Sequence, residues 1–127
     1  MAFLFDSFSA WKKYSTENHK SLVDVVLEYE MDQKGRSAET IWQGLETAWT
    51  VMKDAVRTGL EEDMTSRSGM INNGAKKVYR YPTAVLSKEF QQLISRALAA
   101  KEVNSCMGRI VAAPTAGASG IMPGVLY

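Results

Sequence analysis

Cysteine is almost absent, with Cys106 the only one among 127 residues. One thiol cannot close an internal disulfide, and alone it cannot supply the thiolate set of a structural zinc or iron–sulfur site. A reducing, cytosolic setting fits this composition best. The apolar patch near the N-terminus contains Asp6 and precedes its lysines. That order is wrong for a secretory signal, so we expect no export.

An excess of charge of either sign is also missing. Fifteen basic residues face fourteen acidic ones, which leaves a net charge of +1. No global field is available to hold a phosphate backbone or an anionic bilayer, so we expect neither nucleic acid nor a membrane as a partner. A chain of 14.1 kDa that is 46% hydrophobic has room for one domain with a single core, which excludes two separate domains.

The C-terminal stretch 110–127 carries no charge, although it is long enough to span a bilayer. Its two prolines and three glycines would break a spanning helix and leave polar backbone groups unpaired in lipid. We therefore expect this stretch to be buried in protein, with a new helix beginning near Pro123. Such an apolar segment needs neighbours to pack on. The sequence thus predicts that residues 1–127 are a single incomplete domain, the front portion of a larger all-helical domain.

Apolar residues recur with helical spacing in three segments, which predicts helices at 21–33, 37–63 and 87–107. No run alternates with a period of two, so the predicted fold class is all-α without a sheet. Residues 65–82 contain several glycines and asparagines and are predicted to form a loop around one or two short turns. The predicted buried stripe of the second helix is Ile41, Leu45, Ala48, Met52, Val56 and Leu60. That of the third is Phe90, Leu93, Ile94, Ala97 and Leu98.

The turn at 115–120 is the first candidate for chemistry. Small residues before a helix start let backbone N–H groups approach a ligand, and a helix N-terminus favours an anion. The candidate residues for binding a carboxylate or phosphate are Thr115, Gly117, Ser119 and Gly120. No lysine follows the glycines, which excludes a P-loop. A corner where two helices pack closely is the more common role for such a turn, and both interpretations stay open.

Other polar residues give weaker signals. His19 stands in a polar run without an acidic partner at a defined spacing, so a solvated side chain is the more common interpretation. The basic residues Arg67, Lys76, Lys77, Arg80 and Lys88 form a group with no acidic residue between Met64 and Lys88. Such a group is more often a solvated loop than a phosphate site. No pair of carboxylates suited to acid–base catalysis is identifiable, and no catalytic residue is assigned.

A family resemblance enters with Asn104, Gly108 and the string IVAAPTAGASGIMPGVL at 110–126. This combination resembles the motif of the iron–sulfur-dependent L-serine dehydratase family, in its α chain or α region. More loosely, 41–60 resembles the long second helix of that family and 68–77 resembles its loop. The sequence departs from the family at Asn72, Asn73 and Gly74, where a glycine pair followed by an acidic residue is expected.

The resemblance implies an all-helical L-serine ammonia-lyase that converts L-serine to pyruvate and ammonia. It implies a [4Fe–4S] cluster in the complete enzyme, whose cysteine ligands are expected outside this chain, so that no metal ligand is assigned here. It also implies an oligomeric enzyme with a β chain or β region as partner. The residues at 115–120 would then hold the carboxylate of L-serine, and the 127-residue chain alone is expected to be inactive.

Two alternatives remain beside this interpretation. The first is a helical interaction module that binds a partner through the apolar faces of its helices without catalysis. The second is an enzyme of the related desulfidase type that acts on L-cysteine.

Overall fold

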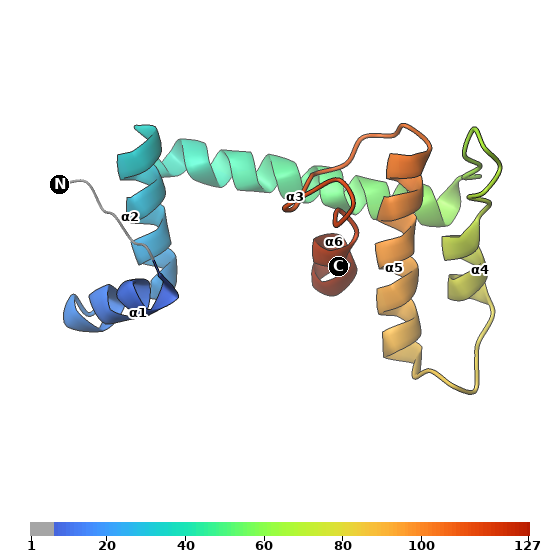
Figure 1. The fold of residues 1–127 in the computed structure, drawn as a ribbon, viewed down its shortest axis with the longest axis horizontal. Coiled ribbons are helices and arrows are strands. Elements are labelled where there is room, and N and C mark those ends of the chain that lie inside the picture. The colour runs from blue at the N-terminus through green and yellow to red at the C-terminus, as the bar shows by residue number, and fades with distance from the viewer. Residues whose placement is uncertain (1–6) are drawn as a thin grey trace. The chain divides into compact units, whose positions relative to one another are not determined.

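The computed structural model describes residues 7–127, and within that range it contains helices and no strand (Figure 1). The helices are α1 (Phe8–Glu17), α2 (Leu22–Lys34), α3 (Ala38–Glu61), α4 (Gly74–Arg80), α5 (Lys88–Ser105) and α6 (Ile121–Leu126). An isolated antiparallel bridge joins Thr65 and Asn72. The prediction of an all-α fold is confirmed.

The three predicted helices correspond to α2, α3 and α5, and each end lies within two residues of its predicted position. The sequence did not predict α1 or α4 as helices, whereas it did predict a helix near Pro123. Helix α1 begins after Ser7, whose Oγ accepts a hydrogen bond from the amide of Ala10 at 3.3 Å, and none of its residues is buried. Its aromatic residues Phe8, Trp11 and Tyr14 recur every third residue, so the sequence contains a helical signal that the prediction did not use. Helix α4 lies in the segment predicted as a loop around short turns, and α6 begins two residues before Pro123.

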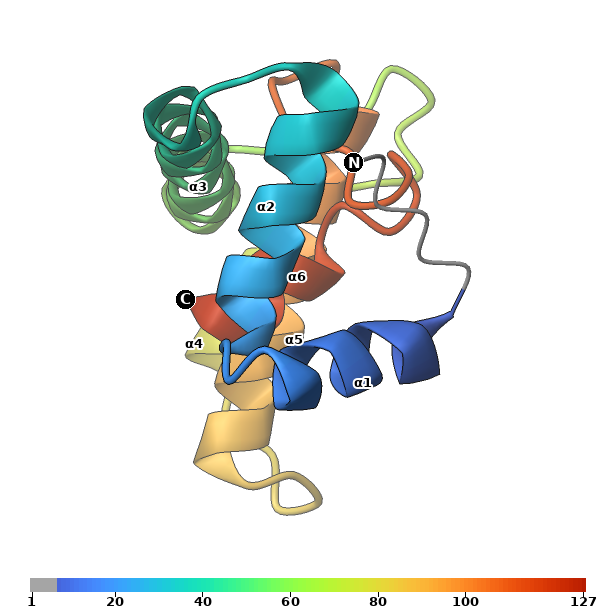
Figure 2. The same ribbon diagram turned by 90° about the vertical axis from the view of Figure 1, so that its left-hand side faces the viewer.

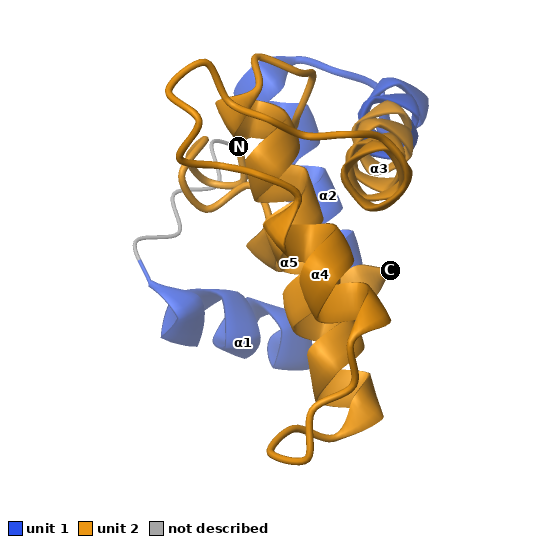
Figure 3. Cartoon of the chain, turned by 90° about the vertical axis from the view of Figure 1, so that its right-hand side faces the viewer, with its two compact units in different colours: residues 1–46 blue, residues 47–127 orange. Residues whose placement is uncertain are grey.

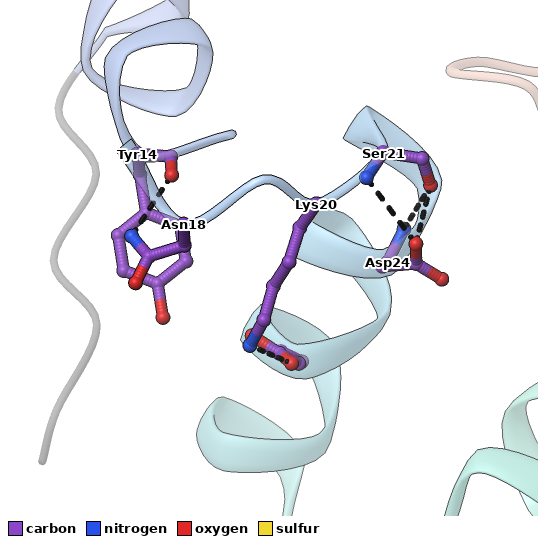
Figure 4. Close-up of polar contacts among 6 residues, drawn as sticks. Tyr14, Asn18, Lys20, Ser21 and Asp24 are labelled. Atoms are coloured by element: carbon purple, nitrogen blue, oxygen red, sulfur yellow. Dashed lines mark hydrogen bonds and ion pairs between the residues drawn. The ribbon is translucent and has the colours of Figure 1, made fainter. Parts of the chain in front are cut away.

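The chain forms two compact units, residues 1–46 and 47–127 (Figure 3). In the first unit α1 packs on α2 (Figure 2), and the ring centroids of Trp11 and Tyr29 lie 5.7 Å apart. Ser21 and Asp24 form a capping box at the start of α2, as Figure 4 shows. These two contacts fix how the chain turns from α1 into α2.

One member of the predicted stripe of α3 is wrong, since Ile41 and Ala48 are half-buried but Leu45 is not. Leu45 is 55% exposed, and Trp42 is 51% exposed. Both side chains line an apolar hollow of about 280 Å³ with residues of α2. In the second half the stripe holds better, because Val56 is fully buried and Leu60 packs against the core. The first half of α3 therefore has fewer neighbours in its unit than its sequence suggests.

The core of the second unit forms between α3 and α5. It consists of Ala55, Val56, Met64, Ala100 and Val103. Gly59 permits this packing, because a Cβ at this position would collide with the backbone of Ala99. The two helices thus approach as closely as their backbones allow.

The predicted buried stripe of α5 is a second correction. Phe90 is 51% exposed, and the other members of that stripe are only partly buried. The buried residues of α5 are instead Gln91, Ser95, Ala99, Ala100, Glu102 and Val103. Half of these are polar, which an apolar-periodicity argument cannot find. Their burial is possible because each polar side chain has a hydrogen-bond partner on the backbone.

Helix α4 explains why polar groups are buried there. It is a seven-residue helix and lies beside α5 (Figure 1). Glu102 Oε1 accepts hydrogen bonds from the amides of Gly74 at 2.8 Å and Ala75 at 3.2 Å, at the start of α4. Gln91 Nε2 donates to the carbonyls of Val78 and Tyr81 at its end. One helix therefore satisfies free backbone groups at both ends of the other.

We expect Gly59→Ala to lower the free energy of unfolding by about 1–3 kcal/mol, because neither the added Cβ nor the Ala99 backbone can move cheaply. Urea unfolding followed by circular dichroism measures this change. The matched control is Gly44→Ala in the same helix, where a Cβ meets no atom within 4 Å. Helix propensity should then raise stability by about 0.5–1 kcal/mol. Equal effects of the two substitutions would contradict the close α3–α5 packing.

Candidate carboxylate-binding site

The segment before α6 folds into a compact turn. The amide of Ala118 donates to both the carbonyl and the Oγ1 of Thr115, each at 3.2 Å. The amide of Ser119 donates to the carbonyl of Ala116 at 3.3 Å, and the amide of Ile121 donates to the carbonyl of Ala118 at 3.0 Å. The peptide bond between Ala113 and Pro114 is cis. The turn is thus built from its own backbone and the Thr115 hydroxyl.

The structure brings two of the four predicted site residues to one hollow. Gly117 and Gly120 line a hollow of about 280 Å³ together with Lys101 and apolar residues of α5 and α6. Thr115 and Ser119 are not among its lining residues. The Thr115 hydroxyl caps the turn, and Ser119 is only 2% exposed, with an Oγ that has no hydrogen-bond partner within residues 7–127.

Gly117, Gly120 and Lys101, which line this hollow, have polar groups that are not used in interactions with other described residues. Among the described residues, the amides of Gly117 and Gly120 make no hydrogen bond, and Lys101 forms no ion pair. The other lining residues are Leu93, Ile94, Ala97, Leu98 and Ile121. An anion in this hollow would meet one positive side chain against an apolar wall.

The two glycines have different roles in packing. A Cβ at Gly120 would collide with the backbone of Ala97 on α5, whereas a Cβ at Gly117 would meet only Thr115 Oγ1 at 3.8 Å. Neither residue has a φ in the left-handed region. Gly120 is therefore a helix-packing corner, one of the two roles that the sequence left open. Gly117 has no steric reason to be glycine in the described chain, so it is the position at which a ligand-binding role can be tested.

Two residues of α5, Lys101 and Asn104, contribute to this region without having been predicted as site residues, and a third unpredicted residue, Glu102, contacts α4 instead. Lys101 lines the hollow, and the next residue, Glu102, binds the start of α4. Asn104 Nδ2 makes a long hydrogen bond of 3.4 Å to the carbonyl of Ala116 and so ties the end of α5 to the turn. The sequence signal for Glu102 is a lone acid beside Ala99, Ala100 and Val103, the small and apolar residues of the helix.

The residues present do not fit an iron–sulfur cluster. Cys106 is the only cysteine, and its side chain packs partly against the core. Within residues 7–127 no three His, Cys, Asp or Glu side chains group closely enough to hold a metal ion. The expectation that the cluster ligands lie outside this chain stays a prediction. None of the described helices is both long and apolar enough to cross a bilayer.

We expect Gly120→Ala to lower the free energy of unfolding by about 1–3 kcal/mol, because its Cβ would push α6 away from Ala97. Gly117→Ala, three residues earlier, should change the free energy of unfolding by less than about 0.5 kcal/mol, because its Cβ has room. Thermal and urea unfolding of the two variants provide the comparison. Equal destabilisation by both substitutions would show that the whole turn is a packing element.

Comparison with known proteins gives the chain a family. Residues 17–127 match the protein family described as serine dehydratase alpha chain. The probable L-serine dehydratase alpha chain of Bacillus subtilis is 36% identical over 107 residues, which cover 82% of this chain and 35% of that protein. The L-serine dehydratase alpha chain of Peptoniphilus asaccharolyticus is 34% identical over 83% of this chain and 37% of that protein.

A third relative is the L-serine dehydratase of Haemophilus influenzae, 33% identical over 90% of this chain and 26% of that protein. The chain thus spans about a third or less of the length of these relatives. No solved structure matches it.

Proposed function

Since the chain belongs to the serine dehydratase alpha chain family, we propose that it supplies the substrate-carboxylate contact of an L-serine ammonia-lyase. In this reaction L-serine loses water to give aminoacrylate, which hydrolyses to pyruvate and ammonia. The proposed contact is the turn at 115–120, with Gly117 and Gly120 as its principal donors.

One observation carries this proposal: Gly117 and Gly120, whose amides make no hydrogen bond among the described residues, line one hollow with Lys101, which forms no ion pair there. A carboxylate has two oxygens that accept several hydrogen bonds, and it is attracted by a nearby cation. The amides of Gly117 and Gly120 can serve the oxygens, while Lys101 supplies the opposite charge. The macrodipole adds little here, because α6 has only six residues.

The roles of Thr115 and Ser119 in this proposal are indirect. The Thr115 hydroxyl stabilises the turn by accepting from the amide of Ala118. Ser119 Oγ is buried and has no partner within residues 7–127, so a small rotation of the turn would bring a further donor toward a bound carboxylate. Thr115 therefore orders the site, and Ser119 completes it once substrate is bound.

The remaining groups of L-serine need partners from elsewhere. Leucine and isoleucine side chains, which form most of the wall, offer no acceptor for the substrate ammonium group. A base for the α-proton and the [4Fe–4S] cluster of the family find no candidate among the described residues. We assign these parts to other segments of the enzyme, including a β chain or β region.

We expect L-serine to bind the chain weakly and to shift the amide resonances of Gly117 and Gly120 saturably in a ¹⁵N NMR titration. Gly117→Val should abolish these shifts because its side chain fills the space next to the free amide. Lys101→Gln should weaken binding by about tenfold, which corresponds to the loss of one charge-assisted contact. Unfolding curves recorded in parallel separate lost binding from lost structure.

The matched control is Lys34→Gln, which removes an exposed lysine from α2 in the other unit and should leave the titration unchanged. Parental binding by a folded Gly117→Val variant would refute the proposed contact. L-cysteine in place of L-serine tests the desulfidase alternative, since tighter binding of L-cysteine would favour that activity.

A further expectation concerns the isolated chain, which has one cysteine. Reconstitution with iron and sulfide under reducing conditions should load no stoichiometric cluster, and no pyruvate should form from L-serine. Iron and sulfide analysis with a pyruvate assay measure both. A chain that binds four irons per molecule would overturn the placement of the ligands outside it.

A further inference from the structure

The basic group singled out in the sequence is gathered by the fold. Four of its five members, Lys76, Lys77, Arg80 and Lys88, line two hollows beside α4, and Arg80 lines both of them. This segment is not part of the proposed carboxylate site. A basic segment without a bound partner usually spreads its side chains into solvent, where each one is screened separately. Lys77, Arg80 and Lys88 are exposed in this way, but Lys76 is buried, and all four line the shared hollows.

The first hollow has a volume of about 300 Å³. Its lining residues are Asp63, Asn73, Lys76, Lys77, Arg80 and Tyr81. Three cations and one carboxylate give this lining a net charge of +2. The volume lies at the lower end of the range for small-molecule sites, which suits a small ligand rather than a macromolecule.

Lys76 is unusual among these residues because it is only 8% exposed. Its Nζ donates to Asp63 Oδ1 at 2.9 Å, and within residues 7–127 the other two protons of the ammonium group have no partner. Asp63 itself is largely exposed, so a single solvated carboxylate is all that balances a buried charge. Burying an ammonium group is costly unless further acceptors reach it.

Arg80, unlike Lys76, forms no ion pair with the described residues. The electrostatic field at this place is positive. The hydrogen bond from Lys76 to Asp63 lowers the pKa of the Asp63 carboxyl, with the charges of Lys76 and Arg80 acting in the same direction. A field that favours ionised Asp63 favours any other anion in the hollow as well.

We propose that the hollow formed by Lys76, Lys77 and Arg80 binds the phosphate group of a small phosphate monoester. Such a group carries a charge of about −1.5 to −2 near neutral pH, which matches the lining, and it has three oxygens for the three cations. The second hollow, of about 470 Å³, begins at Arg80 and offers Thr83, Lys88 and Gln92 to the rest of the molecule.

The test uses the 127-residue chain and inorganic phosphate as the probe, at constant ionic strength set with chloride. A ¹⁵N NMR titration should give saturable shifts at the amides of 73–81 and none at 115–120. Glycerol 3-phosphate should produce the same shifts and extend them to 82–92. Lys77→Gln and Arg80→Gln should each weaken phosphate binding by about tenfold, whereas Lys34→Gln in the other unit should leave it unchanged.

Asp63→Asn is expected to tighten phosphate binding, which a misfolded variant would not do. It removes the one negative charge of the lining and frees the Lys76 ammonium group, so phosphate should bind several-fold more tightly. Shifts no larger than those caused by chloride, parental affinity in Arg80→Gln, or unchanged affinity in Asp63→Asn would each overturn the proposal. Succinate binding more tightly than phosphate would overturn the assignment of the ligand class. Because the residues differ from those of the turn at 115–120, failure here leaves the L-serine site untouched.

Discussion

The second unit depends on the way α5 holds α4. A seven-residue helix is too short to be stable alone, because nucleation costs more than its few hydrogen bonds return. Glu102 accepts from its first amides and Gln91 donates to its last carbonyls, so both ends are tied to one helix. Gly74 permits the approach, since a Cβ there would lie 2.8 Å from Glu102 Oε1. This contact commits the polar face of α5 to α4.

Because the polar face of α5 contacts α4, the partly apolar face of α5 is available to contact α6 and the turn before it. Successive residues on a helix point about 100° apart, so Lys101 and Glu102 serve different sides of α5. Glu102 fixes α4, whose basic residues surround the proposed phosphate hollow. Lys101 lines the hollow at Gly117 and Gly120. The two proposed sites therefore involve different sides of α5 and share no lining residue, so each can be altered without changing the other.

The sequence predicted the long helices to within two residues because their apolar period is strong. It did not predict which face of α5 is buried, since Gln91, Ser95 and Glu102 are polar. The partners of Gln91 and Glu102 are backbone groups ten or more residues away, and Ser95 bonds to the carbonyl of Gln92 in its own helix. It singled out Gly117 and Gly120 as small residues before a helix start, but periodicity offers no way to add Lys101. At Gly74, where the resemblance leads us to expect an acidic residue, the structure shows an amide that donates to Glu102 Oε1.

Hydrogen exchange at the amides of Gly74 and Ala75 tests the hold of α5 on α4 most directly. In the parent chain both amides should be protected, although the first amides of a helix are normally free to exchange. Glu102→Met keeps a side chain of similar size without the acceptor and should speed exchange at these two amides by about tenfold or more. Amides in the second half of α3 serve as the internal reference. Unprotected amides in the parent, or equal protection in the variant, would contradict this account.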